Sequence, residues 1–217
     1  MPWPALAATL FAVIGVGAER VASVWPATEA RRRGPSWRTL AMGAGSAAAA
    51  YGIVASAHLP AWAVLVHLVM LGLMVGLVAT DFEQRRLPHL VLDPLIVVAV
   101  GFAFVNPALE TAAAIVGAVA AVLFLGILTL VIRGGMAMGD LYLAIPIGLT
   151  LGWPQVWSGL FTAALLAAAL SLFLVVTGRV GLRSYIAFGP YLVIGYVVTL
   201  IREASLLAPT VATSLGL

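Results

Sequence analysis

Long apolar stretches run along the whole chain, and short segments that hold most of the charged residues separate them. Most of these eight stretches approach the roughly 20 residues that a helix needs to cross the hydrocarbon core of a bilayer. The pattern predicts an all-α, polytopic integral membrane protein with about eight transmembrane helices. The expected helices cover approximately residues 2–18, 39–57, 61–80, 90–105, 109–132, 141–153, 155–177 and 188–203.

Composition supports a membrane protein. Hydrophobic residues make up 63% of the 217 positions and charged residues 9%, whereas an average soluble domain is roughly 25% charged. The formal net charge of +3 comes from eleven arginines without any lysine, and ten of these arginines lie between the apolar stretches. This distribution of charge indicates how the chain is oriented in the membrane, where it contacts lipid. It does not indicate nucleic-acid binding.

The arginines also predict the orientation. If the eight stretches alternate across the membrane, ten of the eleven arginines fall on one side, which the positive-inside rule assigns to the cytoplasm. Both termini are then outside, and the protein is expected in the plasma (inner) membrane. The first apolar stretch has no basic residue before it, so we expect a transmembrane helix there and not a cleaved signal.

The chain has no cysteine and three scattered histidines. Disulfides and thiolate metal sites are excluded, and a zinc centre of the usual spacing cannot be built from these histidines. We therefore predict chemistry without a metal and without a cofactor.

Two of the three aspartates, Asp81 and Asp140, lie at the ends of apolar stretches on the expected cytoplasmic side. An ionisable side chain inside a bilayer costs about 2.5–3.5 kcal/mol, so its presence suggests a function. The stretch 141–153 would form a helix of only about 20 Å against a core of about 30 Å, which places Asp140 below the headgroups in a wet pocket. Either aspartate could instead be a solvated helix end, and Asp140, which directly precedes Leu141, could be an N-cap.

Two carboxylates that share a site repel each other when both are ionised, so one keeps its proton. The ionised partner can then accept a proton from water while the protonated partner polarises a peptide carbonyl. This is the chemistry of aspartic proteases.

Three segments resemble the type IV prepilin peptidase family. Residues 81–88, Asp-Phe-Glu-Gln-Arg-Arg-Leu-Pro, are similar to its first active-site segment, in which a Pro follows the Asp by seven residues. Residues 135–140, Gly-Met-Ala-Met-Gly-Asp, resemble its Gly-Met-Gly-x-Gly-Asp signature. The third segment resembles its Phe-Gly-Pro-Tyr block and consists of Phe188, Gly189, Pro190 and Tyr191.

The resemblance implies a membrane aspartic endopeptidase that removes the basic leader of type IV prepilins or pseudopilins at the cytoplasmic face. It implies Asp81 and Asp140 as the catalytic residues, and Gly135, Gly139 and Pro88 as parts of the active-site loops. The Phe-Gly-Pro-Tyr block is expected to support the site. We expect the two glycines to give the loop backbone angles that other residues resist. The whole chain, residues 1–217, is expected to form one membrane-embedded domain, with a divergent helix pair at 1–60 and a peptidase core at 61–203.

The sequence also departs from the family pattern. Ala137 replaces a glycine of the second signature, Tyr142 stands where many members carry Lys, and His89 stands where Asn or Asp usually follows the proline. His89 could hydrogen-bond near Asp81, although a lone histidine in a loop is more often exposed. Because the Cys-x-x-Cys motifs of the bifunctional members are absent, we predict no N-methyltransferase activity.

Two other functions are compatible with these residues. Paired membrane carboxylates also suit a cation- or proton-coupled transporter, although the internal repeats typical of many transporters are not evident. A catalytically inactive family member that acts as a pilus assembly factor is the other alternative.

Overall fold

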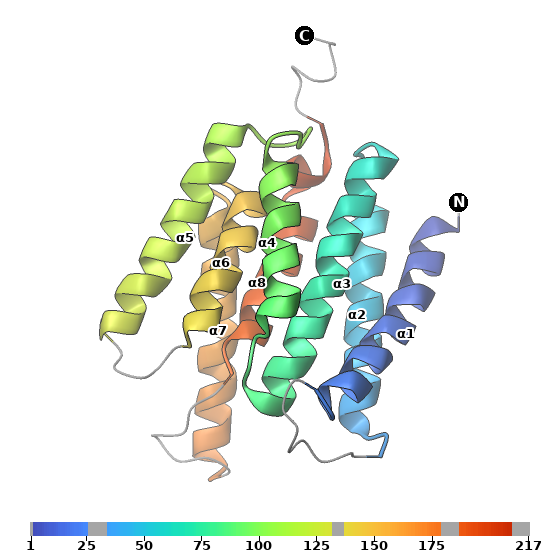
Figure 1. Cartoon of the computed structure of the whole chain (residues 1–217), viewed down its shortest axis with the longest axis vertical. Coiled ribbons are helices and arrows are strands. Elements are labelled where there is room, and N and C mark those ends of the chain that lie inside the picture. The colour runs from blue at the N-terminus through green and yellow to red at the C-terminus, as the bar shows by residue number, and fades with distance from the viewer. Residues whose placement is uncertain (1, 26–33, 132–136, 179–186, 210–217) are drawn as a thin grey trace.

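The computed structural model describes residues 2–25, 34–131, 137–178 and 187–209 (Figure 1). In this part of the chain there are eight α-helices, a short 3₁₀ helix and no strand, so the all-α prediction is confirmed. The elements are α1 (Trp3–Ala22), α2 (Trp37–Ser56), α3 (Ala61–Gln84), α4 (His89–Ala103), α5 (Thr111–Val131), α6 (Met138–Leu151), α7 (Val156–Val176), α8 (Gly189–Arg202) and η1 (Ala204–Leu207).

The outer surface of the helices is apolar. Leu40 is 74% exposed, Leu130 81% and Val176 77%, and soluble monomers rarely expose apolar patches on this scale. Five helices, α1, α2, α3, α5 and α7, are long and apolar enough to cross a membrane, whereas α4, α6 and α8 are shorter apolar helices. The chain is therefore a multi-pass membrane protein, and a count of eight crossings stays a prediction.

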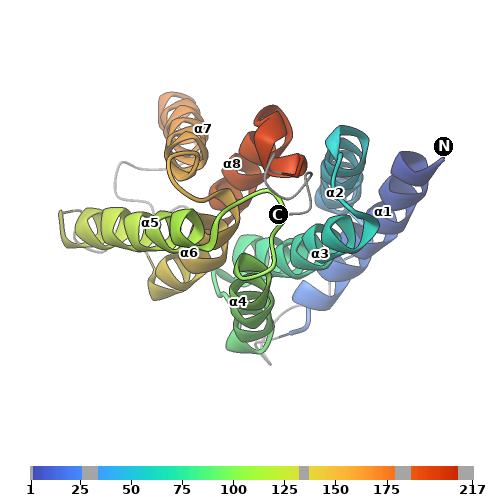
Figure 2. The ribbon, with the colours of Figure 1, turned by 90° about the horizontal axis from the view of Figure 1, so that it is seen from above.

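The helices form one bundle. Figure 2 looks along the bundle and shows α1 and α5 at its opposite edges, with α3, α6 and α8 between them. Contacts of α3 with α4 and α8, and of α6 with α4 and α8, join the middle of the bundle. The C-terminal end of α3 and the N-terminal ends of α6 and α8 lie toward the same end of the molecule (Figure 1). The elements that carry the three family-like segments are thus neighbours.

A pair of glycines lets α5 and α6 approach closely. A Cβ atom on Gly117 would lie 2.6 Å from the carbonyl oxygen of Gly148, and one on Gly148 would lie 2.5 Å from the Cα of Ala118. Inside a bilayer the hydrophobic effect does not drive helices together, because lipid tails are as apolar as the side chains. Close backbone approach of this kind is therefore a main source of helix–helix stability. The contact holds α6, and with it Asp140, in place against α5.

Candidate active site

Asp81 belongs to the last turn of α3 and is only 6% exposed. The expected helix ended at residue 80, but the observed helix continues to Gln84 and ends where Arg85 adopts the left-handed conformation, with φ 53°. The backbone N–H of Arg85 donates to the carbonyl oxygen of Asp81, at 2.9 Å. Because the backbone of Asp81 is helical, its carboxylate leaves the helix in a fixed direction, toward the interior of the bundle.

Asp140 is the third residue of α6 and is 3% exposed. Its Oδ2 accepts a hydrogen bond from the backbone N–H of Ala137, at 3.2 Å. Helix α6 begins at Met138, three residues before the expected start, so the carboxylate lies in the first helical turn and not in a loop. The positive end of the α6 dipole favours a negative charge at this position.

Ala137 does not disturb this arrangement. It precedes α6 with φ −82° and ψ 149°, an extended conformation that any L residue adopts. Its contact with Asp140 uses the backbone N–H, which glycine and alanine share. The replacement of the family's glycine by Ala137 is therefore compatible with the geometry around Asp140.

Gly189 brings the two carboxylates together. A Cβ atom on Gly189 would lie 2.7 Å from Oδ2 of Asp81 and 3.6 Å from Oδ1 of Asp140. Both oxygens therefore face one point at the start of α8, and their separation cannot exceed the sum of these two distances. The close approach requires glycine, because real Cβ atoms essentially never come within 3.0 Å of another heavy atom.

Oδ2 of Asp81 is buried and has no hydrogen-bond partner in the described part of the chain. A buried polar atom without a partner costs roughly 1–3 kcal/mol, and such atoms in native structures call for an explanation. Here the atom faces the second carboxylate across Gly189, so a shared proton, a water or a substrate group can satisfy it.

Gly139 joins the first two family-like segments. A Cβ atom on Gly139 would lie 3.0 Å from both Cβ and Cδ1 of Leu87. We expected this glycine to supply an unusual backbone angle, but among the described glycines only Gly152 and Gly178 have a positive φ. That expectation is wrong for Gly139, which is helical, and a Cβ atom there would require the Leu87 side chain to shift by a few tenths of an ångström.

The other predicted residues surround these contacts. Pro88 is the N-cap of α4, and its carbonyl oxygen accepts from the N–H groups of Val91 and Leu92 at 3.0 Å. Pro190 is in the first turn of α8, and Tyr191 is 6% exposed. Phe188 is half-buried against the core. Gly135 falls outside the described residues.

Asp93 joins His89 and Tyr142 in a small cluster at the start of α4. Nδ1 of His89 lies 3.0 Å from Oδ1 of Asp93, and the His89 and Tyr142 rings meet edge to face at 5.3 Å. The His89 side chain is 64% exposed, as expected for a lone histidine. Its spacing of four residues from Asp93 on one helix could have predicted their pairing. The contact between His89 and Tyr142, two of the departures from the family pattern, could not be predicted, because these residues lie on different helices.

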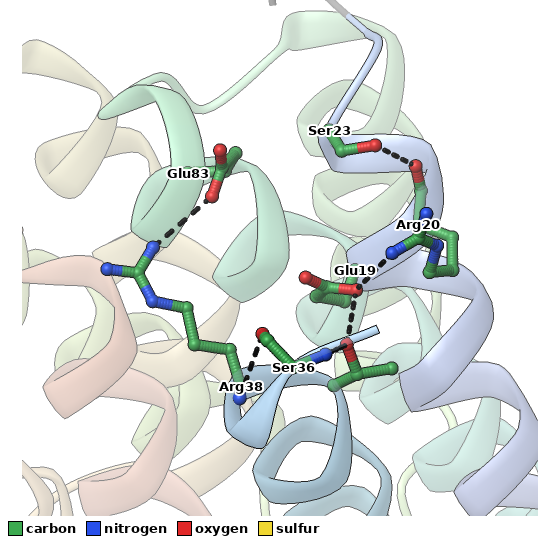
Figure 3. A network of polar contacts seen from close by, with 7 residues as sticks. Glu19, Arg20, Ser23, Ser36, Arg38 and Glu83 are labelled. Carbon is green, nitrogen blue, oxygen red and sulfur yellow. Dashed lines mark hydrogen bonds and ion pairs between the residues drawn. The ribbon is translucent and has the colours of Figure 1, made fainter. Parts of the chain in front are cut away.

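Figure 3 shows polar contacts that tie α1, α2 and α3 together. Nη1 of Arg38 lies 3.3 Å from Oε2 of Glu83, and the Thr39 hydroxyl donates to Oε2 of Glu19 at 3.0 Å. The Gln84 amide donates to the carbonyl oxygen of Ala22, at 2.7 Å. These bonds fix the end of α3 that carries Asp81. In the part of the chain that the structure describes, no three His, Cys, Asp or Glu side chains gather where they could hold a metal ion.

The fold and these contacts define a class of protein: a multi-pass helical membrane protein with two buried carboxylates brought together at one end of its bundle. The Type IV leader peptidase family matches residues 68–176, which is half of the chain and includes both Asp81 and Asp140. The chain belongs to this family.

A relative, the prepilin leader peptidase/N-methyltransferase of Bacillus subtilis (strain 168), is 25% identical over 148 residues. The aligned region covers 68% of this chain and 60% of the relative. No solved structure matches the chain.

Proposed function

We propose that the protein is an aspartic endopeptidase that removes the leader peptide from type IV prepilins or pseudopilins, with Asp81 and Asp140 as its catalytic dyad. Membership of the leader peptidase family supports the cleavage of a leader. The observation that carries the two-aspartate mechanism is the position of Gly189, which has one carboxylate oxygen of each aspartate within 3.6 Å of its would-be Cβ.

In the proposed reaction one carboxyl is ionised and the other protonated. The ionised carboxylate accepts a proton from water as the water oxygen attacks the scissile carbonyl carbon, and the protonated carboxyl gives its proton to the carbonyl oxygen. The tetrahedral diol then collapses. The C–N bond breaks, the departing amine takes the proton that came from water, and a diol hydroxyl returns the other proton to the second carboxylate.

Asp81 and Asp140 are fixed for this chemistry before substrate arrives. Each carboxylate extends from a helical turn, Gly189 and the Ala137 N–H lie directly against the carboxylates, and Leu87 packs on Gly139 next to Asp140 in the chain. Catalytic groups held in the productive geometry by their surroundings need no reorganisation during the reaction. The contacts of Gly139 and Gly189 therefore join all three family-like segments around the two carboxylates.

We further propose that the dyad faces the cytoplasm and that both termini lie outside, in the plasma (inner) membrane. The arginines support this orientation, because Arg20, Arg38, Arg85 and Arg86 lie close to the helix ends around the dyad. Short apolar helices such as α6 would leave the site recessed from the headgroups.

A test is co-expression with a prepilin, with cleavage followed by the gel mobility of the substrate. Asp81→Asn and Asp140→Asn should each abolish the shift to the mature form. Asp93→Asn is a matched control, because it makes the same change at the third aspartate, whose side chain is 65% exposed, and it should process the leader normally. Normal processing by either Asp81→Asn or Asp140→Asn would refute the dyad.

The two alternative functions are less well supported. Family membership does not favour a transporter. An inactive assembly factor has no need for two buried carboxylates that meet at a glycine, and the co-expression test separates it from an active enzyme directly.

A further inference from the structure

An apolar groove with a volume of about 590 Å³ lies between α2, α3 and α8. Its volume is within the roughly 300–1,000 Å³ of typical ligand sites. Small residues of α2, including Ala41, Gly45 and Ala48, form one wall, and Val193 and Val197 of α8 form part of another. None of the catalytic contacts described above uses this groove.

The groove begins next to the dyad. Phe82 and Pro190 both line it, and they directly follow Asp81 and Gly189 in the chain. From Pro190 it continues along α8 as far as Ile201, which is about 16 Å at the helical rise of about 1.5 Å per residue. At that far end Ile201 packs on Gly52 of α2. A Cβ atom on Gly52 would lie 2.5 Å from Cδ1 of Ile201.

The end nearest the dyad is charged, unlike the rest of the groove. Glu19, Arg38 and Glu83 line it, and the side chains of Glu19 and Glu83 are only 12% and 14% exposed. Figure 3 shows Arg38 reaching across from α2 to Glu83 on α3. A groove of this kind suits a chain segment whose charged or polar part lies at the dyad and whose apolar part follows it into the bilayer.

We propose that the α2–α3–α8 groove binds the apolar helical segment of the protein substrate that adjoins the scissile bond. This inference rests on the proposed function and extends it to the question of how the substrate is held. Small residues on α2 allow a second helix to approach closely in lipid, as in other helix-in-groove recognition. A lipid also has a charged head and an apolar tail, but only a chain that is to be cut needs a groove that starts at the carboxylates.

Disulfide cross-linking tests the occupant without background, because the chain has no cysteine. Ala48→Cys places a thiol in the groove. Ala44→Cys is the matched control, since Ala44 is exposed one turn away on the same helix but does not line the groove. Each is combined with Asp140→Asn in liposomes and oxidised with a prepilin that carries one cysteine in the middle of its apolar segment.

Cross-linking at Ala48→Cys should exceed that at Ala44→Cys about tenfold, because only the Ala48 position faces the proposed occupant of the groove. Equal yields at the two positions would overturn the proposal, and so would no cross-link at either, which is the result expected if lipid fills the groove.

A kinetic measurement gives a second readout. Ala48→Trp, which fills the groove, should raise the KM for the full-length prepilin about tenfold, whereas Ala44→Trp should leave it unchanged. An equal KM for the two variants would overturn the proposal. If the wild-type protein cleaves no prepilin, the proposed function fails, and the cross-linking result still decides whether the groove holds an apolar segment.

Discussion

Gly189→Ala is the most informative single substitution, because the added methyl group would meet both aspartates. The new Cβ would lie 2.7 Å from Oδ2 of Asp81, whereas carbon and oxygen ordinarily meet at about 3.3 Å or more. The carboxylate or the start of α8 must therefore move by roughly 0.6 Å. Catalytic groups need to be held to within about 0.5 Å, so the displacement should be felt in the chemical step.

We expect kcat to fall about 10- to 100-fold in Gly189→Ala, a loss of about 1.4–2.7 kcal/mol of transition-state stabilisation. The assay is cleavage of a prepilin by the purified protein in liposomes, with products separated by mass. KM should change much less, because most of the groove proposed to bind the apolar segment of the substrate extends along α2 and α8 away from Gly189. Thermal unfolding measured on the same samples separates a catalytic defect from a folding defect.

Gly72→Ala is the control for adding a methyl group to a glycine of the bundle. Nothing lies within 4 Å of the Cβ position at Gly72, and an alanine there should leave kcat unchanged. If Gly189→Ala keeps the wild-type kcat, Gly189 does not hold the two carboxylates in their reactive positions, and the reasoning from its contacts is refuted.

Three further outcomes are expected. Gly139→Val should lower kcat about tenfold or more, since its side chain would displace Leu87 from a 3.0 Å contact; wild-type cleavage would show that this packing is unimportant. Ala137→Gly should change kcat less than about threefold, because the extended backbone at Ala137 suits either residue; a large gain would show that the alanine impairs the site. In intact cells, an impermeant maleimide should label His58→Cys and not Arg86→Cys, both exposed positions, and the reverse pattern would contradict the proposed orientation.

Helix positions could be predicted well from the sequence, because apolar length dominates in a membrane protein. The helix expected at 109–132 is observed at Thr111–Val131, and the helix expected at 155–177 is observed at Val156–Val176. Errors were larger at the two aspartates. The helix around Asp81 runs four residues further than expected, and α6 starts three residues earlier. The extension of α3 includes Glu83 and Gln84, which are polar but have good helix propensity, so the length of the apolar stretch underestimates the length of the helix.

The candidate site could be predicted only in part. Asp81 and Asp140 were identified from their cost in lipid and from the family-like segments. The contact of Gly189 with both carboxylates, and that of Gly139 with Leu87, could not be foreseen, because they depend on how three separate helices and the α3–α4 connection pack. The groove is likewise a property of three helices and has no signature in any one of them.

The central claim is that Asp81 and Asp140 act as one unit, and a double-mutant cycle tests it most directly. Residues that act together are strongly non-additive in their effects on rate. We predict that Asp81→Asn, Asp140→Asn and the double variant all fall to the same residual kcat for prepilin cleavage. If each single variant keeps part of the activity and the losses add in the double variant, the two aspartates act independently and the dyad is contradicted.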